Sequence, residues 1–272
     1  MVPSIARVTR RDFVRTTVGT LAAAPFAGGR SADAAFAQTA GALTETTELK
    51  RLVAANRILA HESVVDAFGH VSIRDPGNPA RYIMARSRSP ELVEFGDLIR
   101  FEQDGKSLDP TNRTPYGERM IHGAIYAARP DVHSVVHNHA YPLLPFTITG
   151  RKLEPVVHVA SVIGAEIPIW DIATKFKETD MLVRSMEQGR DLAATLGRNT
   201  SALMRGHGAV IAAPSLHQVV GRAYYLDLNA RLQLQTIQLG GRQVSYLDAA
   251  EAKNATQDYE RSWEFWKSRL PR

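Results

Sequence analysis

Arg129-Pro-Asp-Val-His-Ser-Val-Val-His-Asn-His139 marks the change from a helix to a strand in this chain. The Arg-Pro-Asp turn ends the helical pattern of residues 114–129, and the residues after it are rich in the β-branched side chains that strands favour. On a strand, side chains two residues apart point to the same face. His137 and His139 can therefore bind one ion together, and the stretch predicts a strand that carries two metal ligands.

A third histidine comes from a distant segment. His207 lies sixty-eight residues after His139, in the turn Arg205-Gly-His-Gly208, whose glycines allow the backbone to approach an ion closely. The helix at 114–129 carries Glu118 and leads directly into the histidine strand, so a carboxylate can lie beside the same ion. Ordinary core or surface histidines are the alternative, but three of them together with a glutamate favour a metal site.

The chain contains no cysteine, which excludes disulfides, thiolate nucleophiles and thiolate metal ligands. Any metal must therefore be bound by imidazole, carboxylate and water. Imidazole accepts zinc, manganese and iron, so the sequence predicts a divalent ion without choosing among these three.

Composition excludes two classes of partner. The 272 residues are 44% hydrophobic, enough for a sizeable core, and no apolar run reaches the about 20 residues that cross a bilayer. The formal net charge is +5, but residues 1–37 contain five arginines and two aspartates, so the remainder carries +2. It has no long lysine or arginine run. We therefore expect no membrane span and no nucleic-acid partner.

The N-terminus has the pattern of a twin-arginine export signal. Thr9-Arg-Arg-Asp-Phe-Val-Arg15 precedes a weakly apolar stretch, and Ala35-Phe-Ala37 supplies small residues at a cleavage-site spacing. We expect residues 1–37 to be a signal peptide and residues 38–47 to be a disordered mature N-terminus. The protein is then periplasmic or secreted, with the twin-arginine export machinery as a partner.

The remaining chain, 48–272, has no internal repeat and no linker, and it is predicted to be one α/β domain. Hydrophobic periodicity predicts further helices at 45–61, 179–196 and 215–239 and a helical or buried segment at 143–148. Alternation and turn residues predict strands at 70–74, 81–85, 98–102, 156–162 and 166–170, and a strand, turn and strand over 202–211.

Four segments together resemble the class II aldolase/adducin family, over roughly residues 48–265. They are Gly69-His-Val-Ser72, Gly117-Glu-Arg-Met-Ile-His-Gly-Ala-Ile-Tyr126, the stretch from Arg129 to His139, and Leu203-Met-Arg-Gly-His-Gly-Ala-Val-Ile211. The resemblance implies a single three-layer α/β/α sandwich around a mainly antiparallel central sheet. It also implies a homotetramer with active sites near subunit interfaces and one divalent ion per subunit. His137, His139 and His207 match the metal ligands, and Glu118 matches the residue that transfers a proton or adds a further ligand.

Departures from the family pattern bear on the substrate. Sugar-phosphate enzymes of the family hold phosphate through an asparagine in Gly-Asn-x-Ser, a Thr-x-Ser-Gly turn and a Ser-Ser pair before the glutamate. Here these positions hold His70, the segment 85–89 and Tyr116-Gly117, so most of the phosphate-holding hydroxyls are missing. The replacements suit carboxylates, planar rings or phenolic oxygens. The chain resembles the branch that decarboxylates hydroxylated aromatic or heteroaromatic dicarboxylates. The residues predicted to bind substrate are His70, Ser72, Arg86, Arg88, Tyr116 and His158.

Each of these assignments has a structural alternative. Arg86 and Arg88 can be solvated loop charges, and His158 can be a histidine hydrogen-bonded within a sheet. His122 and His133 are predicted to be structural.

We therefore predict a divalent-metal-dependent carbon–carbon lyase that acts on a non-phosphorylated hydroxy-aromatic or keto acid. Decarboxylation through a metal-stabilised enolate is favoured, with Glu118 donating or accepting the proton at carbon. Three alternatives are a class II aldolase that performs retro-aldol cleavage, an iron-dependent oxygenase on the same three histidines, and a non-catalytic adducin-like module. The intact metal constellation argues against the last, because a scaffold has no physical need for it.

Overall fold

The computed structural model describes residues 43–271 except 242 and 256. The predicted signal peptide at 1–37 and residues 38–42 lie outside this range. Leu43 packs against the core, and the Oγ1 of Thr46 accepts the backbone N–H of Leu49 at 3.3 Å, which caps the first described helix. The helix that follows, Thr47–His61, starts within the segment 38–47.

A seven-stranded sheet forms the middle of the molecule, in the order β3-β2-β1-β4-β7-β6-β5. Its strands are β1 His70–Arg74, β2 Arg81–Ala85, β3 Leu98–Glu102, β4 Ser134–Asn138, β5 Ile169–Trp170, β6 Ser201–Met204 and β7 Gly208–Ala213. Every neighbouring pair is antiparallel except β5 with β6. The mainly antiparallel central sheet is confirmed.

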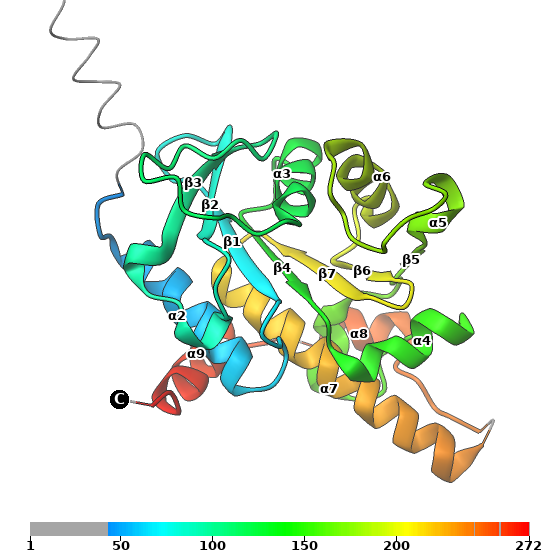
Figure 1. Cartoon of the computed structure of the whole chain (residues 1–272). Helices are drawn as coiled ribbons and strands as arrows, with labels where there is room; N and C mark the ends of the chain where they lie inside the picture. The colour runs from blue at the N-terminus through cyan, green and yellow to red at the C-terminus, as the bar shows by residue number, and fades with distance from the viewer. Residues whose placement is uncertain (1–42, 242, 256, 272) are drawn as a thin grey trace, which may run out of the picture.

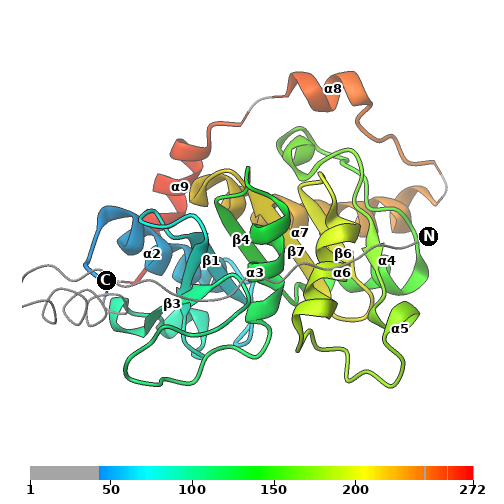
Figure 2. The ribbon, with the colours of Figure 1, turned by 90° about the horizontal axis from the view of Figure 1, so that it is seen from above.

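Helices cover both faces of this sheet (Figures 1 and 2). One face packs against α3 Arg119–Ala128 and α6 Met186–Leu196, with the short α5 Ile172–Lys175 beside β5. The other face packs against α2 Thr47–His61 and α7 Leu216–Gly240, and α9 Tyr259–Ser268 lies on α7. The shorter helices are α4 Leu144–Thr149 and α8 Ala249–Asn254. The predicted three-layer sandwich is confirmed, and none of the described helices is both long and apolar enough to span a bilayer.

The register of β1 against β4 separates the core from the polar site. Val71 pairs with Val136, and both are fully buried. One residue earlier on β1, His70 pairs with His137. Because successive side chains on a strand point to opposite faces, the two valines and the two histidines lie on opposite faces of the sheet. The histidines lie on the face covered by α3, since His70 contacts His122 of that helix.

Two predicted elements have other structures. The segment 156–162 is not a strand but leads into the 3₁₀ helix η4 His158–Ile163. The side chain of Asn229 on α7 accepts the N–H of Val156 and donates to the carbonyl of Glu154, so backbone groups that a neighbouring strand would pair are already bonded. Of the strand predicted at 166–170, only β5 at its end pairs with a neighbour.

Two predicted helices start later than expected. The helix predicted at 179–196 begins only at Met186, because Ser185 and Gln188 form a capping box at its start. The helix predicted at 114–129 begins at Arg119, because Pro115 pairs with Arg86 in an isolated β-bridge. Each of these helices is therefore preceded by a loop, and both loops contribute to the cavity described below.

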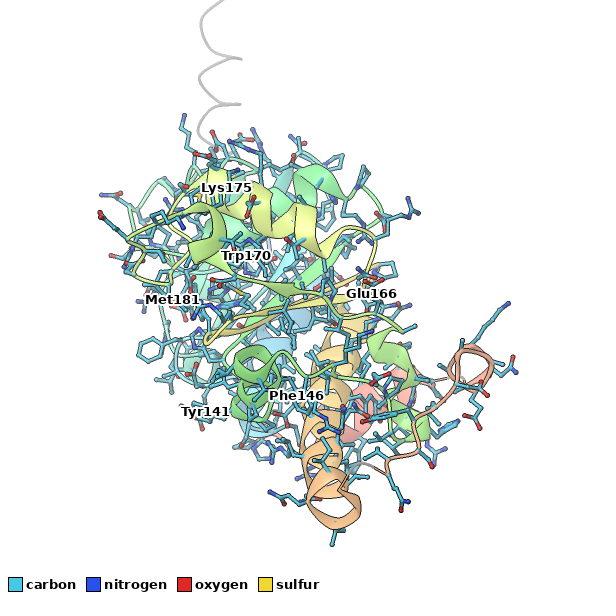
Figure 3. All side chains as sticks on the ribbon, turned by 90° about the vertical axis from the view of Figure 1, so that its right-hand side faces the viewer. Tyr141, Phe146, Glu166, Trp170, Lys175 and Met181 are labelled. Atoms are coloured by element: carbon cyan, nitrogen blue, oxygen red, sulfur yellow. The ribbon has the colours of Figure 1, made fainter. Side chains whose placement is uncertain are left out.

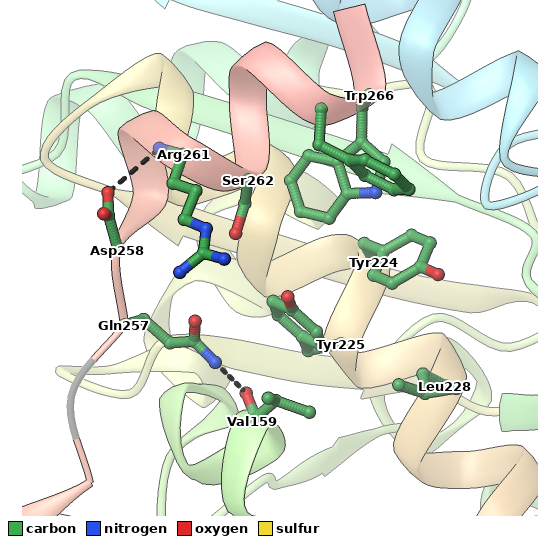
Figure 4. A pocket seen from close by; sticks show the side chains of 10 residues that line it. Val159, Tyr224, Tyr225, Leu228, Gln257, Asp258, Arg261, Ser262 and Trp266 are labelled. Carbon is green, nitrogen blue, oxygen red and sulfur yellow. Dashed lines mark hydrogen bonds between the residues drawn. The ribbon is translucent and has the colours of Figure 1, made fainter. Parts of the chain in front are cut away.

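The C-terminal helix α9 was not predicted, and it adds two tryptophans to the core. Trp263 and Trp266 are buried, and the ring of Trp266 lies 4.8 Å from that of Tyr224 on α7. A cavity of about 540 Å³ opens between α7 and α9 beside Tyr225 and Arg261 (Figure 4). Its lining contains none of the residues predicted to bind a metal or a substrate.

At the β5 end of the sheet, Trp170 lies between the sheet and α6, where its indole N–H donates to Asp191 (Figure 3).

Candidate metal centre

The structure brings Glu118, His137, His139 and His207 together. One ligand atom from each lies within 4.8 Å of all the others. The Nε2 of His139 is 3.2 Å from the Nε2 of His137 and 3.2 Å from that of His207. The Oε2 of Glu118 is 3.4 Å and 3.5 Å from the same two nitrogens of His137 and His207. The four side chains come from β4, the residue after it, the β6–β7 turn and the N-cap of α3.

Each histidine of this cluster is oriented by a hydrogen bond at its other ring nitrogen. The Nδ1 of His137 lies 3.1 Å from the carbonyl of Ala209, and that of His207 lies 2.9 Å from the carbonyl of Met181. A carbonyl oxygen only accepts, so Nδ1 carries the proton in both rings. The lone pair of each Nε2 is therefore free and points to the centre of the cluster.

The carboxylate of Asp66 orients the ring of His139 by a hydrogen bond at Nδ1. The sequence analysis did not identify Asp66. Both of its carboxylate oxygens lie 3.2 Å from the Nδ1 of His139. Burial opposes ionisation of Asp66, but the N–H of Phe68 and the neighbouring His139 outweigh it and lower the pKa of Asp66. A carboxylate that holds a histidine in this way fixes the ring and raises its basicity as a ligand.

The donor set fits a divalent cation. Three Nε2 lone pairs and a carboxylate oxygen converge without a hydrogen atom between them, and such acceptors repel one another unless a positive charge lies at their centre. Imidazole and carboxylate together suit zinc, manganese or iron. The whole cluster is also largely removed from solvent, with His137 fully buried.

Glu118 is held in place by the loop before α6. Its Oε1 accepts the backbone N–H of Val183 at 2.9 Å, which leaves Oε2 for the cluster. Burial disfavours the carboxylate, whereas the N–H of Val183 and a divalent ion bound by the three lone pairs would both favour it. The same loop supplies the carbonyl of Met181 to His207, so one backbone segment orients two members of the cluster.

The glycines around His207 allow the β6–β7 turn to approach β4. Gly206 has a φ of +63°, and its N–H donates to the Oγ1 of Thr147 at 3.0 Å. A Cβ atom at Gly208 would lie only 1.9 Å from the carbonyl oxygen of Asn138. Only glycine permits this approach of the β6–β7 turn to β4, and the approach brings His207 beside His139.

A cavity of about 660 Å³ opens onto Glu118 and His139. Its lining combines apolar and aromatic groups with two arginines: Ala67, Phe68, His70, Ser87, Arg88, Ser89, Tyr116, Gly117, Leu182 and Arg184. Phe68 is 69% exposed, which is unusual for a phenylalanine and gives the cavity an aromatic wall. A planar acid can pack its ring against Phe68 and Tyr116 and place a carboxylate near an arginine.

Three of the six residues predicted to bind substrate line this cavity, namely His70, Arg88 and Tyr116. Tyr116 donates its hydroxyl hydrogen to the carbonyl of Arg88, and burial raises the pKa of Tyr116 to about 12, so the phenol is neutral. Arg86 is not part of the lining. Its Nε donates to Asp97 at 2.7 Å, and Arg88 donates to the second oxygen of the same carboxylate at 2.7 Å.

The structure does not bring Ser72 or His158 to the cavity. Ser72 is fully buried on the face covered by α3, where its hydroxyl lies 2.6 Å from the Nδ1 of His122. His158 is exposed and lines a separate cavity beside Leu247, because its segment is a 3₁₀ helix rather than a strand. The sequence analysis missed Arg184 and Phe68, whose positions in loops depend on the complete fold.

Comparison with known proteins relates the chain to one family and one fold. The sequence pattern of the Class II Aldolase and Adducin N-terminal domain matches residues 50–234. Decarboxylase tropJ from Talaromyces stipitatus is 35% identical over 210 residues, which are 72% of this chain and 79% of that protein. The 3,4-dihydroxyphthalate decarboxylase of Arthrobacter keyseri is 27% identical over 215 residues, 75% of this chain and 84% of the relative. The crystal structure of an aldolase II superfamily protein from Pseudomonas syringae has a TM-score of 0.71 at 19% identity, covering 84% of this chain and 94% of that one, and so shares the fold.

Proposed function

This chain belongs to the class II aldolase and adducin family, and on that basis we propose that it is a divalent-metal-dependent decarboxylase of a non-phosphorylated hydroxy-aromatic acid. It is a carbon–carbon lyase of the class II aldolase type, with relatives named as decarboxylases. The observation that carries the choice of substrate is the cavity above Glu118. It combines Phe68, Tyr116 and Arg88, a set that suits a planar acid. His70 and Tyr116 stand at positions where the resemblance implies phosphate-holding groups in sugar-phosphate enzymes.

We propose that His137, His139 and His207 hold the ion and that Glu118 lies beside it as the proton-transfer group. A bound divalent ion supplies an electrophile that stabilises negative charge on a substrate oxygen while the carbon–carbon bond breaks. Zinc, manganese and iron remain the candidates, and metal analysis of the purified protein distinguishes them.

The residues of the chain then bind the acid and move its proton. Phe68 and Tyr116 hold the ring, and Arg88 draws the leaving carboxylate to one side of the cavity. The ionised Glu118 accepts the phenolic proton of the substrate as it binds. When the carboxylate departs as CO₂, the electron pair of the broken bond stays with the ring carbon, and Glu118 returns its proton to that carbon. The product phenolate takes one proton from solvent as it leaves, which balances the reaction.

Incubation with hydroxybenzoic and dihydroxyphthalic acids tests this proposal. We expect stoichiometric CO₂ and the matching phenol, and Glu118→Gln should reduce the rate by about 10²–10⁴-fold, as expected for loss of a general acid–base group. An aldehyde released from hydroxy-keto acids, without CO₂, would instead indicate an aldolase. Oxygen uptake is measured in parallel, because an iron-dependent oxygenase on the same ligands would consume O₂. No turnover of any acid would overturn the lyase assignment.

We also propose that the protein acts outside the cytoplasm as a homotetramer. Residues 9–15 support twin-arginine export, and the family resemblance supports the tetramer. Replacement of Arg10 and Arg11 by lysine should keep the protein in the cytoplasmic fraction, and light scattering on the purified protein measures its oligomeric state. Full export of the lysine variant would contradict twin-arginine export. A monomer in solution would contradict the homotetramer.

A further inference from the structure

A row of four polar side chains runs from the cavity into the layer between the sheet and α3. The hydroxyl of Tyr126 lies 2.7 Å from the Oγ of Ser72, and that Oγ lies 2.6 Å from the Nδ1 of His122. The Nε2 of His122 lies 2.7 Å from the Nδ1 of His70. None of the four is more than 1% exposed. His70 is the end that lines the cavity, and its Nε2 has no hydrogen-bond partner among the residues that the structure describes.

Each of the three hydrogen bonds in the row is made by one proton. The direction in which the groups donate along the row therefore decides which nitrogen of His70 is protonated. Two directions are possible, and they differ at Tyr126. In the first, Tyr126 donates to Ser72. In the second, Ser72 donates to Tyr126, and the hydroxyl hydrogen of Tyr126 must go to the carbonyl of His133, 3.4 Å away.

The first direction is favoured because it places every proton in a short bond. An O–H···O bond of 3.4 Å is long, whereas the contact with Ser72 is 2.7 Å. The carbonyl of His133 also needs no second donor, since it already accepts the N–H of Arg74 at 2.7 Å. Tyr126 therefore donates to Ser72, and Ser72 donates to the Nδ1 of His122.

The tautomers of His122 and His70 follow from the direction in which Ser72 donates. With Nδ1 accepting, neutral His122 carries its proton on Nε2 and donates it to the Nδ1 of His70. Burial lowers the pKa of His122 to about 3, so this ring is neutral at physiological pH. A neutral His70 whose Nδ1 accepts carries its proton on Nε2, the nitrogen without a partner.

We propose that Tyr126, Ser72 and His122 are positioning residues that hold His70 as the Nε2–H tautomer, so that His70 donates a hydrogen bond to an anionic oxygen of the substrate. The proposal rests on the proposed function only for the nature of that oxygen, a carboxylate or phenolate. The ring is also held laterally, with Tyr116 at 4.6 Å and His137 at 5.1 Å between ring centroids. A fixed donor in a buried site stabilises developing negative charge without reorganising. It also leaves Glu118 as the group that exchanges protons.

Neutron crystallography of the perdeuterated, zinc-loaded protein tests the tautomers directly. We expect deuterium on Nε2 of both His70 and His122, and on the Ser72 hydroxyl in the direction of His122. Deuterium on Nδ1 of His70 would overturn the proposal, whatever reaction the enzyme catalyses. This readout separates its failure from a failure of the proposed function.

Ser72→Ala removes the donor to His122, and Ser134→Ala is its matched control. Ser134 is equally buried, but its hydroxyl donates to the backbone carbonyl of Ser72 outside the row. In Ser72→Ala we expect deuterium to be shared between both nitrogens of His122 and of His70, and kcat/KM to fall about 10-fold, the range for a hydrogen bond to a charged group. Ser134→Ala should keep the tautomers of the wild type. Unchanged histidines in Ser72→Ala would contradict the proposal.

Discussion

Asp66 and His139 share two equal contacts, 3.2 Å from the histidine Nδ1 to each carboxylate oxygen. The other two histidines of the cluster are oriented by backbone carbonyls, of Ala209 and Met181. Of the three groups that orient these histidines, only Asp66 is a side chain, so only Asp66 can be removed by a substitution. It also places a negative charge beside the cluster, which a carbonyl does not.

Asp66→Asn should weaken metal binding by about 10–100-fold, the usual cost of losing an outer partner of a ligand histidine. Competition against a fluorescent chelator measures the change. Asp104→Asn is the control, because Asp104 is exposed and bonds only within its own turn. Equal affinities for Asp66→Asn and the wild type would mean that Asp66 does not orient His139.

Substitution of a ligand should have a larger effect than substitution of Asp66. His207→Ala removes one of the three converging nitrogens, so we expect the protein to retain less than one ion per subunit after dialysis and to lose its activity. His133→Ala controls for the loss of a histidine, since His133 lies outside the cluster and contacts Glu48 at 3.4 Å. Elemental analysis gives the stoichiometry. Full metal content in His207→Ala would exclude it as a ligand.

Arg88 and Arg86 allow a matched test of carboxylate recognition. Both are held by Asp97, but only Arg88 lines the cavity. Arg88→Met should raise KM for an aromatic acid by about 10–100-fold, because a hydrogen bond to a charged group is lost. Arg86→Met should change KM much less. Steady-state kinetics on one acid compares them, and equal effects would show that the pair acts only through the loop.

The stability of the metal-free protein should depend on pH through His122. Its pKa in the folded state is about 3, below the unfolded value of 6.5, because burial disfavours the charged ring. Between these values the unfolded state binds the extra proton, so stability is complete above pH 6.5 and falls as the pH is lowered toward 3. The slope from one such group is at most about 1.4 kcal/mol per pH unit. Urea unfolding of chelator-treated protein at a series of pH values measures this dependence. The free energy of unfolding of His122→Gln should change less steeply with pH than that of the wild type. Identical slopes would argue against a neutral His122.

Gly208→Ala should destabilise the fold and displace His207. The added Cβ would meet the carbonyl of Asn138 at 1.9 Å, a conflict that costs about 1–3 kcal/mol when a well-packed site must shift. Gly240→Ala is the control, since nothing lies within 4 Å of its Cβ position. Thermal unfolding should separate the two by several degrees, with metal affinity reduced only in Gly208→Ala. Equal melting temperatures would contradict the close approach.

Local patterns in the sequence were sufficient for much of the sheet and for the pair of His137 and His139. The strands at 70–74, 81–85 and 98–102 have the predicted bounds, because alternation and turn residues are local signals. Residue type and spacing also brought out His137 and His139, since a strand places side chains two apart on one face. These predictions needed no knowledge of distant contacts.

Other features depend on partners far away in the chain. The segment 156–162 has the composition of a strand, but Asn229 of α7 takes the backbone bonds that a strand would make. Asp66 has no distinguishing neighbour in the sequence, and only the fold brings it to His139. The late start of α6 could have been found, since Ser185 and Gln188 have the spacing of a capping box.

The loop before α6 divides two tasks between alternate residues. Met181 and Val183 act through their backbone groups, on His207 and Glu118, whereas the neighbouring side chains Leu182 and Arg184 face the cavity. An exchange of side chains at 182 and 184 therefore leaves the peptide groups that support the chemistry in place. Evolution, or a mutant library restricted to these two positions, can retune which acids are accepted while the catalytic apparatus is inherited unchanged.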